Sequence, residues 1–463
     1  MTSDRKKAIF ISAFSNFVVR NILDTDFLGL LKKEENLRIV IIAPEYKKDY
    51  LKENFESGNV VVEGVAVPAL DKGKIFLGFL SRSLLNTNTV KLFLRLRLNL
   101  KTPKGFLNYF LSRLITLLFH RSYWAKALLR KADYYFLPKD RYRAVFEKYE
   151  PDLVFSTDLT DRSEGESDID LIREAKSRGV FVAGMVRSWD NLTGRGIIRE
   201  VPDKIIVHNN IIKKECLFYN HIAEGDVITV GIPHYDNYLK AKPKDKKEFF
   251  DELGLLPDKK TILFVVTADR FLQKQFGKKR VSFNKYILEL LSKFDPETTQ
   301  ILVRFPLIGS VELGDFSPPG NMIFDRPQRL FGKGELDSEA EKHLIDSLSH
   351  SDVVLPGPST IALDALLFKK PVIFVAFDAE KNLPQHESIR KFFHVEHLRP
   401  LMEMGGARIA NNEEEFFESI ENYLKNPNLD SKLREDTVNK ACWRVDGKSS
   451  QRLATVILDF VFE

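Results

Sequence analysis

Continuous apolar runs, each followed by a segment with a helical pattern, constrain this chain more than any other feature of its sequence. Residues 37–44 (LRIVIIAP) and 203–209 (DKIIVHN) are such runs: they are rich in β-branched residues and do not alternate apolar with polar positions. Runs of this kind fit strands buried on both faces, and strands that alternate with helices form parallel sheets covered by helices. We therefore expect an α/β protein with doubly wound, Rossmann-like sheets.

The strand–helix alternation occurs twice along the chain. The expected strands are residues 6–14, 37–44, 60–68, 151–158, 180–186, 203–209 and 226–233 in the first half, and 259–269, 298–309, 321–325, 353–355 and 372–377 in the second. We predict an N-terminal Rossmann-like domain (1–238), a lysine-rich linker (239–252), a second Rossmann-like domain (253–440) and a C-terminal helix (441–463). Parallel sheets bind ligands at the carboxyl ends of their strands, which predicts a site in a cleft between two facing domains.

The overall composition is that of a globular protein and excludes several classes. Charged residues make up 29% of the 463 residues and hydrophobic residues 44%, which argues against disorder. The two cysteines, Cys216 and Cys442, lie far apart and form neither a metal-binding spacing nor a disulfide framework, which indicates a reducing, cytoplasmic compartment. No run of about 18 apolar residues is present, so we expect no membrane-spanning helix.

Residues 72–132 form a basic insert, which contains thirteen Lys and Arg and no Asp or Glu. Apolar residues are interleaved with the basic ones, as in KLFLRLRLNL (91–100). Two interpretations are open. The insert could consist of helices with solvated basic faces, or it could lie on an anionic membrane with aromatic side chains in the lipid and Lys and Arg on the headgroups. Nucleic acid is not an expected partner, because no recognisable DNA- or RNA-binding motif accompanies the insert.

The stretch SDVVLPGPSTIALDALLFKKPVIFVAFD (351–378) predicts a strand, a tight turn and a helix. The prolines of the turn favour an extended chain, and Ser359 is expected to cap the helix. The free amides at residues 359–361 suit a phosphate group. Asp364 lies one turn further along the same helix face, where it could accept the ribose hydroxyls of a nucleotide. The alternative is a well-capped helix in which Asp364 meets only solvent or a neighbouring amide.

Together these motifs resemble the GT-B glycosyltransferases, in which two Rossmann-like domains face a cleft and the last helix crosses back onto the first domain. SDVVLPGPSTIALDALLFKKPVIF (351–374) and ILVRFP (301–306) resemble CDP-glycerol glycerophosphotransferases and capsule-polysaccharide transferases. VITVGIPHYD (227–236) is similar to the segment that closes the first domain in those families and in UDP-N-acetylglucosamine 2-epimerases. DGKSSQRLATVIL (446–458) is similar to the last helix of the fold.

The resemblance implies a nucleotide-activated donor in the second domain and an acceptor in the first. The donor-binding residues would then be Thr267, Arg270, Arg304, Pro358, Ser359, Thr360 and Asp364. Families of the glycerophosphotransferase type carry Arg-x-His-Pro where this chain has Arg-Phe-Pro at 304–306, so the histidine is absent. This difference favours a sugar donor over glycerophosphate. The alternative for Arg304 is an ordinary salt bridge.

The candidate acceptor site lies in MVRSWDNLTGRG (185–196), where several polar residues follow an apolar run. An inverting transferase needs a group that takes the acceptor proton, and Asp190 and Asp158 are the candidate bases. A capping role is the alternative for each. His208 and His234 are expected to line the site rather than to act as the base. The expected acceptor-binding residues are Ser15, Asn16, Arg187, Ser188, Trp189 and Asn191.

We therefore predict an inverting glycosyltransferase of surface glycan synthesis at the inner face of the cell membrane. It would move a sugar from a nucleotide sugar to a lipid-linked or polysaccharide acceptor. No metal or other cofactor is expected, because the DID sequence at 168–170 begins a helix, where acids suit the dipole. Arginines and a helix N-terminus would offset the charge of the leaving diphosphate. The alternatives are a UDP-sugar 2-epimerase, a CDP-glycerol-type glycerophosphotransferase and a non-catalytic, membrane-docked nucleotide-binding protein.

Overall fold

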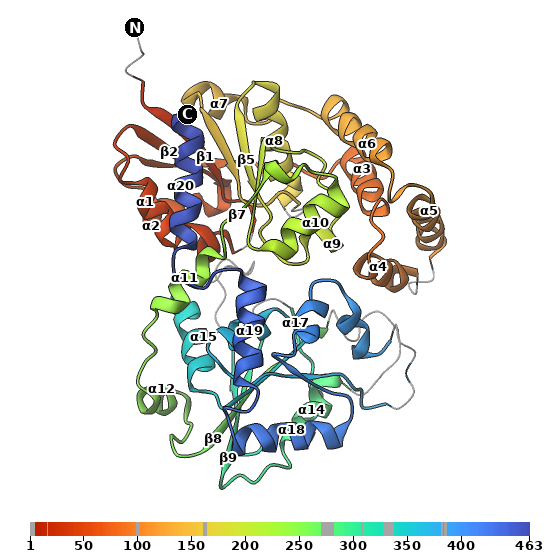
Figure 1. The fold of residues 1–463 in the computed structure, drawn as a ribbon, viewed down its shortest axis with the longest axis vertical. Helices are drawn as coiled ribbons and strands as arrows, with labels where there is room; N and C mark the ends of the chain where they lie inside the picture. Colours follow the sequence, from red (N-terminus) through yellow and green to blue (C-terminus); the bar gives the residue numbers. More distant parts are fainter. Residues whose placement is uncertain are drawn as a thin grey trace. The chain divides into compact units, whose positions relative to one another are not determined.

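The structure is a computed structural model, and it describes residues 5–15, 17–98, 102–160, 164–269, 282–306, 309–326, 338–380, 383 and 387–463. The chain divides into two compact units, whose elements are labelled in Figure 1. Unit 1 comprises residues 1–90, 110–240 and 442–463, and unit 2 comprises residues 91–109 and 241–441. The last helix of the chain is therefore part of the first unit.

Unit 1 is built on a seven-stranded parallel sheet with the order β3-β2-β1-β4-β5-β6-β7. Its strands are β1 (Lys7–Ser12), β2 (Leu37–Pro44), β3 (Val60–Val65), β4 (Leu153–Ser156), β5 (Phe181–Met185), β6 (Lys204–Val207) and β7 (Val227–Thr229). All seven strands expected in the first half of the chain are present, and the Rossmann-like fold is confirmed. The strand order reverses between β1 and β4, so loops at their carboxyl ends diverge and leave room for a ligand.

The helices of unit 1 connect these strands as the alternating pattern predicts. They are η1 (Val19–Leu23), α1 (Asp26–Leu31), η2 (Glu45–Lys47), α2 (Lys48–Phe55), α3 (Lys72–Ser83), α4 (Asn88–Leu98, mostly in unit 2), α5 (Pro103–Phe119), α6 (Tyr123–Phe136), α7 (Arg143–Tyr149), η3 (Glu164–Glu166), α8 (Ser167–Ser177), α9 (Asn191–Gly194), α10 (Asn210–Asn220), η4 (Glu224–Asp226), α11 (Pro233–Lys240) and α20 (Ser449–Phe462).

One difference concerns residues 18–33, whose sequence predicts a single helix. A π-helical turn closes instead, with the Asp24 amide donating to the Val19 carbonyl at 2.8 Å. Thr25 then caps a new helix, α1, by accepting a hydrogen bond from the Phe27 amide. The local capping residue therefore interrupts the helical pattern.

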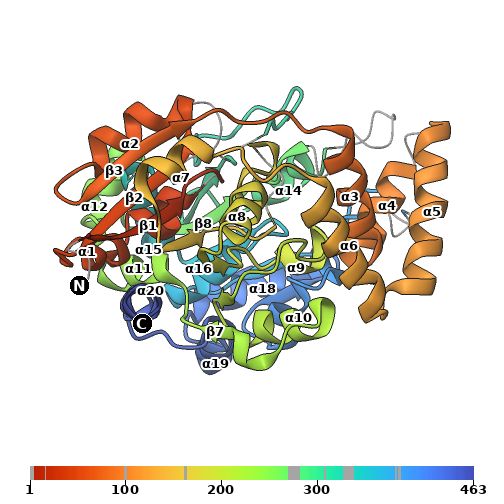
Figure 2. The ribbon, with the colours of Figure 1, turned by 90° about the horizontal axis from the view of Figure 1, so that it is seen from above.

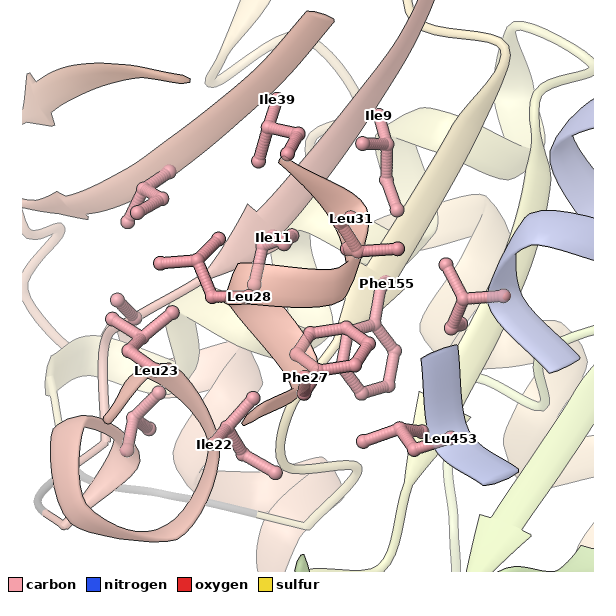
Figure 3. Close-up of a cluster of buried hydrophobic side chains, with 14 of the residues drawn as sticks. Ile9, Ile11, Ile22, Leu23, Phe27, Leu28, Leu31, Ile39, Phe155 and Leu453 are labelled. Atoms are coloured by element: carbon pink, nitrogen blue, oxygen red, sulfur yellow. The ribbon is translucent and has the colours of Figure 1, made fainter. Parts of the chain in front are cut away.

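The last helix completes the core of unit 1. Leu453 of α20 is fully buried in the same apolar cluster as Ile11 of β1, Phe27 of α1 and Phe155 of β4 (Figure 3). The rings of Phe27 and Phe155 meet edge to face with their centroids 5.6 Å apart. Because α20 supplies buried side chains to this cluster, the expected return of the C-terminal helix to the first unit is confirmed.

Buried ion pairs fasten the basic insert to α8. Lys74 of α3 lies 2.5 Å from Asp170, and Arg173 pairs with Asp170 at 2.7 Å and with Asp133 of α6; all four side chains are buried. Figure 2 shows α3 and α6 side by side. Removing one partner of such a buried pair is strongly destabilising, so these contacts fix where the insert attaches.

The acids at 168–170 do more than complement a helix dipole, which corrects the expectation from the DID sequence. Asp170 belongs to the ion-pair network described above. Asp168 is also buried, and its carboxylate accepts hydrogen bonds from the hydroxyls of Ser12 and Ser156. Asp168 thereby ties α8 to the ends of β1 and β4.

Unit 2 has a second parallel sheet with the order β10-β9-β8-β11, and a parallel bridge from Val354 to Val372 continues it to the β12-β13 pair. The strands are β8 (Lys260–Val265), β9 (Thr299–Arg304), β10 (Met322–Asp325), β11 (Val353–Pro356), β12 (Ile373–Val375) and β13 (Arg408–Ala410). The sequence predicts all of them except β13, whose three residues are too few to form a recognisable run. This sheet also reverses its order, between β8 and β11.

The helices of unit 2 surround this sheet (Figure 1). They are α12 (Lys246–Leu253), α14 (Phe283–Leu291), α15 (Ser338–His350), α16 (Ile361–Leu367), η5 (Ile389–His394), α17 (Arg399–Glu403), α18 (Glu413–Lys425) and α19 (Ser431–Cys442). Across both units, none of the helices in the described ranges has the length and apolar character that a membrane span requires.

Candidate functional site

The candidate donor site lies at the point in unit 2 where the strand order reverses. Thr267 follows β8, and Gly357 follows β11, which is paired with β8. The two loops approach so closely that a Cβ built on Gly357 would lie 2.2 Å from Oγ1 of Thr267. Any larger residue at position 357 would require the Thr267 side chain to shift. Oγ1 of Thr267 is buried and has no hydrogen-bond partner within the described ranges.

The turn before α16 keeps the capping residue that the sequence predicts. Thr360 holds the N-cap position and its side chain makes no capping hydrogen bond, but Oγ of Ser359 accepts a hydrogen bond from the Ile361 amide at 3.4 Å, so Ser359 caps the helix as expected. Ser359 is exposed, while Pro358 and Thr360 are partly exposed. Asp364 lies in the first turn of α16 and is 8% exposed. The four residues thus follow β11 in the predicted order, and their part in nucleotide binding stays a prediction.

Asn284 is a site residue that the sequence analysis missed. Its side-chain oxygen accepts a hydrogen bond from the Thr267 amide at 3.0 Å, and its Nδ2 donates to the Thr267 carbonyl at 2.7 Å. Asn284 lies in the first turn of α14, in the sequence FNKYILELL, where nothing distinguishes it from a surface residue. Arg270, the other predicted residue of this loop, lies outside the described residues.

Arg304 forms a buried ion pair at the carboxyl end of β9. Its Nη1 lies 2.6 Å from Asp325, the last residue of β10, and Nε2 of His343 lies 3.0 Å from the same carboxylate. Burial alone would raise the pKa of Asp325, but hydrogen bonding and the charges of His343 and Arg304 lower it below its usual value. Arg304 is thus tied to a carboxylate, and a phosphate contact stays a prediction.

Phe305 stands between Arg304 and Pro306, where this chain lacks the histidine expected from the Arg-x-His-Pro motif, and it is packed rather than available for chemistry. It is 5% exposed, and the guanidinium of Arg326 lies 3.7 Å from its ring centroid. Its ring also meets Phe324 edge to face at 5.2 Å. An aromatic side chain in this environment contributes burial and a cation–π contact, and no proton transfer.

A cavity of about 550 Å³ opens at the carboxyl ends of β12 and β13 in unit 2. Two aromatic rings, Tyr286 and Phe377, meet edge to face in its wall, with their centroids 6.1 Å apart. Arg390 is fixed there by hydrogen bonds to the carbonyls of Ala376 and Asn411. Because β12 continues the parallel sheet beyond β11, this cavity and the Thr267 loop lie on the same edge of that sheet.

In unit 1, Asp158 is the centre of a buried hydrogen-bond network. Its Oδ2 accepts from Nε and Nη2 of Arg187 at 3.2 and 3.0 Å, and its Oδ1 accepts from Nδ2 of Asn191 and from the Thr160 amide, both at 3.0 Å. Asp158 is fully buried. The network brings together three of the predicted residues, and it uses Asp158 to hold Arg187 and Asn191.

The other predicted residues of unit 1 lie in the same loops. The Ser188 hydroxyl donates to Asp190 at 2.6 Å, and Asp190 is less buried than Asp158. Trp189 is 8% exposed, and Ser15 is fully buried at the end of β1. Asn16 lies outside the described residues. Within the described ranges, no three His, Cys, Asp or Glu side chains could hold a metal ion, and metal-independent transfer stays a prediction.

The fold and these two sites define a class of protein: a transferase with a GT-B-type fold. The features that define this class are two Rossmann-like units, polar loops at the carboxyl ends of their strands, and a last helix that packs into the first unit. More particularly, the chain belongs to the CDP-glycerol:poly(glycerophosphate) glycerophosphotransferase family, whose model matches residues 198–459, more than half of the chain. The resemblance expected from the sequence is confirmed.

Relatives and solved structures agree with this assignment. The teichoic acid ribitol-phosphate polymerase TarL of Staphylococcus aureus is 24% identical over 234 residues, which are 50% of this chain and 37% of TarL. The UDP-GlcNAc 2-epimerase from Neisseria meningitidis bound to UDP-GlcNAc matches 98% of this chain and 100% of its own, with TM-score 0.53 and 13% identity. A variant of the wall teichoic acid polymerase TagF matches 99% of this chain and 89% of its own, with TM-score 0.51 and 14% identity.

These likenesses differ in what they support. At 13% and 14% identity, the two solved structures establish the fold alone. The sequence match spans about two fifths of the length of the curated relatives. The activity of those longer proteins therefore bears on this chain only as a proposal.

Proposed function

We propose that this enzyme transfers a sugar from a nucleotide-sugar donor to a lipid-linked or polysaccharide acceptor in cell-surface glycan synthesis. The observation that carries the proposal is the close approach of Thr267 and Gly357 where the strand order of unit 2 reverses. Ligands of doubly wound sheets bind at this place. Membership of a transferase family that takes nucleotide-activated donors supports the same assignment.

The donor diphosphate would bind between the two loops of unit 2. The Thr267 hydroxyl and the Thr360 amide would supply hydrogen-bond donors there, and Asp364 would accept from the ribose. The expectation of free amides does not hold for Ser359 and Ile361, because these two amides already donate to the Gly357 carbonyl and to Oγ of Ser359. The cavity beside Tyr286 and Phe377 would take a further part of the donor, because it lies on the same sheet edge. These neutral donors would stabilise the leaving diphosphate without a metal ion.

A second candidate is transfer of an alditol phosphate, as in glycerophosphate or ribitol-phosphate transfer. The family match and the name of TarL favour it. Against it stands the absence of the motif histidine, since Arg304 is followed only by the packed aromatic ring of Phe305 and by Pro306. We infer that the sugar donor fits this chain better.

Asp190 is the base that we propose for the acceptor hydroxyl. Asp158 accepts several hydrogen bonds from Arg187, Asn191 and Thr160, so its lone pairs are occupied and its negative charge is offset. Asp190 lies in the same loop as Arg187 and is partly exposed, where an acceptor could reach it. A base needs hydrogen-bonding access to the proton that it takes, and Asp190 meets this condition better.

The basic insert would place the enzyme on an anionic membrane surface. Helices α5 and α6 expose large apolar side chains, among them Leu117 (75%), Trp124 (78%) and Leu128 (69%). Not all thirteen basic residues can reach a lipid, since Lys74 and Lys126 are buried and Arg130 donates to the carbonyls of Ile198 and Asn220. Among the basic residues whose burial the structure describes, the exposed ones are Lys72, Arg95, Arg113, Arg121 and Lys131. Exposed apolar groups beside cations suit the membrane interface.

A donor screen tests the proposal. Thermal shift and calorimetric titration with UDP-, CMP-, CDP-, GDP- and TDP-sugars and with CDP-glycerol should reveal one preferred nucleotide sugar. The Asp364→Asn variant should bind it about tenfold more weakly, because one charged hydrogen-bond acceptor is lost. Preference for CDP-glycerol would favour the second candidate. A product formed from the donor alone would indicate an epimerase, and binding without turnover would indicate a non-catalytic protein.

A further inference from the structure

Arg187 and His208 stand next to each other at the carboxyl edge of the unit 1 sheet. Strands β5 and β6 are parallel, and Met185 pairs with Ile206. Beyond the strand ends the pairing continues, since the Val186 amide donates to the Ile206 carbonyl at 2.9 Å. One residue further along each chain, Arg187 lies opposite His208.

His234 comes to the same place from the next strand. The Val230 amide donates to the Val207 carbonyl at 3.0 Å, so the loop after β7 begins beside His208. The crossing helix then holds this loop: Gly231 has a φ of +97°, and a Cβ on it would lie 2.4 Å from Oγ of Ser449. The turn that leads into α11, and so to His234, is therefore packed closely against the last helix, which favours a pre-formed position for His234.

The two imidazoles are buried with polar atoms unsatisfied. His208 is 4% exposed and His234 is 7% exposed, and Nδ1 of each lacks a hydrogen-bond partner among the described residues. Arg187 is 9% exposed and donates to Asp158 through Nε and Nη2, and Nη1 takes no part in these two hydrogen bonds. Buried polar atoms without partners are rare in folded proteins and mark places where a ligand or a bound water completes the bonding.

The surroundings of both rings are positively charged. Burial, followed by the charge of Arg187, lowers the pKa of His208 to about 4. Burial, followed by the charges of Arg20 and His208, lowers the pKa of His234 well below its usual value. No carboxylate contributes to either shift, although Asp158 is bound to Arg187. Asp158 offsets part of the charge of Arg187, so an anion would be held by the hydrogen-bond donors of the three side chains together with the remaining positive charge.

We propose that Arg187, His208 and His234 form an anion subsite that receives a phosphate group of the acceptor. The assignment rests on the proposed function, which places the acceptor in unit 1. Two imidazole N–H groups and one guanidinium N–H supply three donors, and phosphate oxygens are strong acceptors of such charge-assisted hydrogen bonds. The acceptor class is thus narrowed to phosphate-bearing molecules, such as a lipid phosphate or a phosphodiester chain end.

Calorimetric titration of the full-length protein tests the subsite. The probes are inorganic phosphate, glycerol 3-phosphate and glycerol. Wild type should bind both phosphates and not glycerol. His208→Leu and His234→Leu should each weaken phosphate binding about tenfold or more, the usual effect of losing a hydrogen bond to a charged group. His208→Asn and His234→Asn retain a nitrogen near the Nδ1 position and should stay within about threefold of wild type on the same grounds.

A matched control separates a local effect from general damage. His350 lies in unit 2, where its Nε2 is 2.8 Å from the Lys244 carbonyl, so His350→Leu should leave phosphate binding unchanged. Circular dichroism confirms that each variant is folded. The NMR ring signals of ¹³C-labelled histidines give a second measurement that does not depend on affinity. On addition of phosphate, the signals of His208 and His234 should shift before those of the other histidines.

Several outcomes would overturn the subsite. They are no phosphate binding by wild type, equal binding by the two Leu variants, or ring signals that move only for histidines of unit 2. Displacement of phosphate by CDP or UDP would also overturn it, since the anion would then be the donor diphosphate. Failure of the proposed function looks different: wild type would bind no nucleotide while phosphate binding and its loss in the Leu variants persisted.

Discussion

The carboxylate of Asp236 caps the helix that begins at Ser449. It accepts hydrogen bonds from the backbone amides of Ser449 at 3.1 Å and Ser450 at 2.7 Å, and all three residues are buried. Asp236 and Ser449 are 213 residues apart in the chain, and their contact links the two motifs VITVGIPHYD and DGKSSQRLATVIL. The cap joins α11, which contains His234, to the last helix.

Asp236→Ala should destabilise the protein by about 1–3 kcal/mol. The substitution removes a charged cap and leaves two buried amides without an acceptor. Urea unfolding followed by fluorescence measures the loss. Asp258→Ala, at an exposed position with no comparable contact, is the control and should change stability by less than about 0.5 kcal/mol. Equal effects of the two substitutions would show that the cap is unimportant.

Gly357→Ala should disturb the donor loop and weaken nucleotide binding. The added Cβ would lie 2.2 Å from Oγ1 of Thr267, closer than any ordinary contact. Overpacking of this kind costs about 1–3 kcal/mol. Thr267→Ala removes the atom that clashes, so the double variant should be more stable than Gly357→Ala alone. A double-mutant cycle measures this coupling, and strictly additive effects would contradict it.

The sequence predicts features that depend on a local pattern of residues, and it does not predict features that depend on contacts between positions far apart in the chain. The strands of both units are readable because buried parallel strands require long apolar runs, as at residues 37–44. The strand β13 is missed because three residues carry no periodicity. The last helix is recognised through a motif, but its cap by Asp236 joins distant positions, and nothing local to either position indicates the other.

The same contrast between local patterns and distant contacts applies to the candidate sites. Ser359, Thr360 and Asp190 could be proposed as site residues because polar residues at the end of an apolar run are conspicuous in sequence, and their roles stay predictions. Asn284 and Asp325 act through tertiary contacts with Thr267 and Arg304, so a single sequence contains no sign of them. Predicting the role of Asp158 would require knowing that Arg187 and Asn191 converge on it.

Asp158→Asn should destabilise unit 1 by about 3–5 kcal/mol. The change removes the negative partner of Arg187 and leaves a buried guanidinium uncompensated. Arg187→Gln in the same chain should restore part of the loss, because the unpaired charge is then gone. Chemical denaturation of the single and double variants provides the measurement. If Asp158→Asn were as stable as wild type, the network would not be structural.

The pKa of His208 predicts a pH dependence of stability. Its folded value of about 4 lies below its ordinary value of 6.5, so the unfolded state binds more protons between these values. The contribution of His208 to the free energy of unfolding is therefore complete above pH 6.5 and is lost as the pH falls through 4. This contribution amounts to about 3 kcal/mol. Urea unfolding between pH 7.5 and 4.5 should show a smaller loss for His208→Leu than for wild type. Parallel profiles would contradict the assignment.

Membrane binding should depend on both the apolar and the basic side chains of the insert. Leu117 and Trp124 are 75% and 78% exposed, and burying one such side chain in lipid is worth about 1.5–3 kcal/mol. Leu117→Ser and Trp124→Ser should therefore each weaken binding to phosphatidylglycerol vesicles about tenfold. Arg113→Gln and Arg121→Gln should each reduce the free energy of binding to these vesicles by about 1 kcal/mol, and this difference from wild type should disappear at high salt.

Phe462→Ser supplies the control for this experiment, because Phe462 is 48% exposed but belongs to α20 rather than to the insert. Co-sedimentation with vesicles measures the binding, and phosphatidylcholine vesicles test the need for anionic lipid. If the Leu117 and Trp124 variants sediment like wild type, the insert does not contact the bilayer. If binding is equal on neutral vesicles, the basic residues have no part in it. An interfacial surface that combines apolar insertion with headgroup contacts predicts one specific result. Wild type should bind anionic vesicles, and this binding should be lost in the insert variants but not in the Phe462→Ser control.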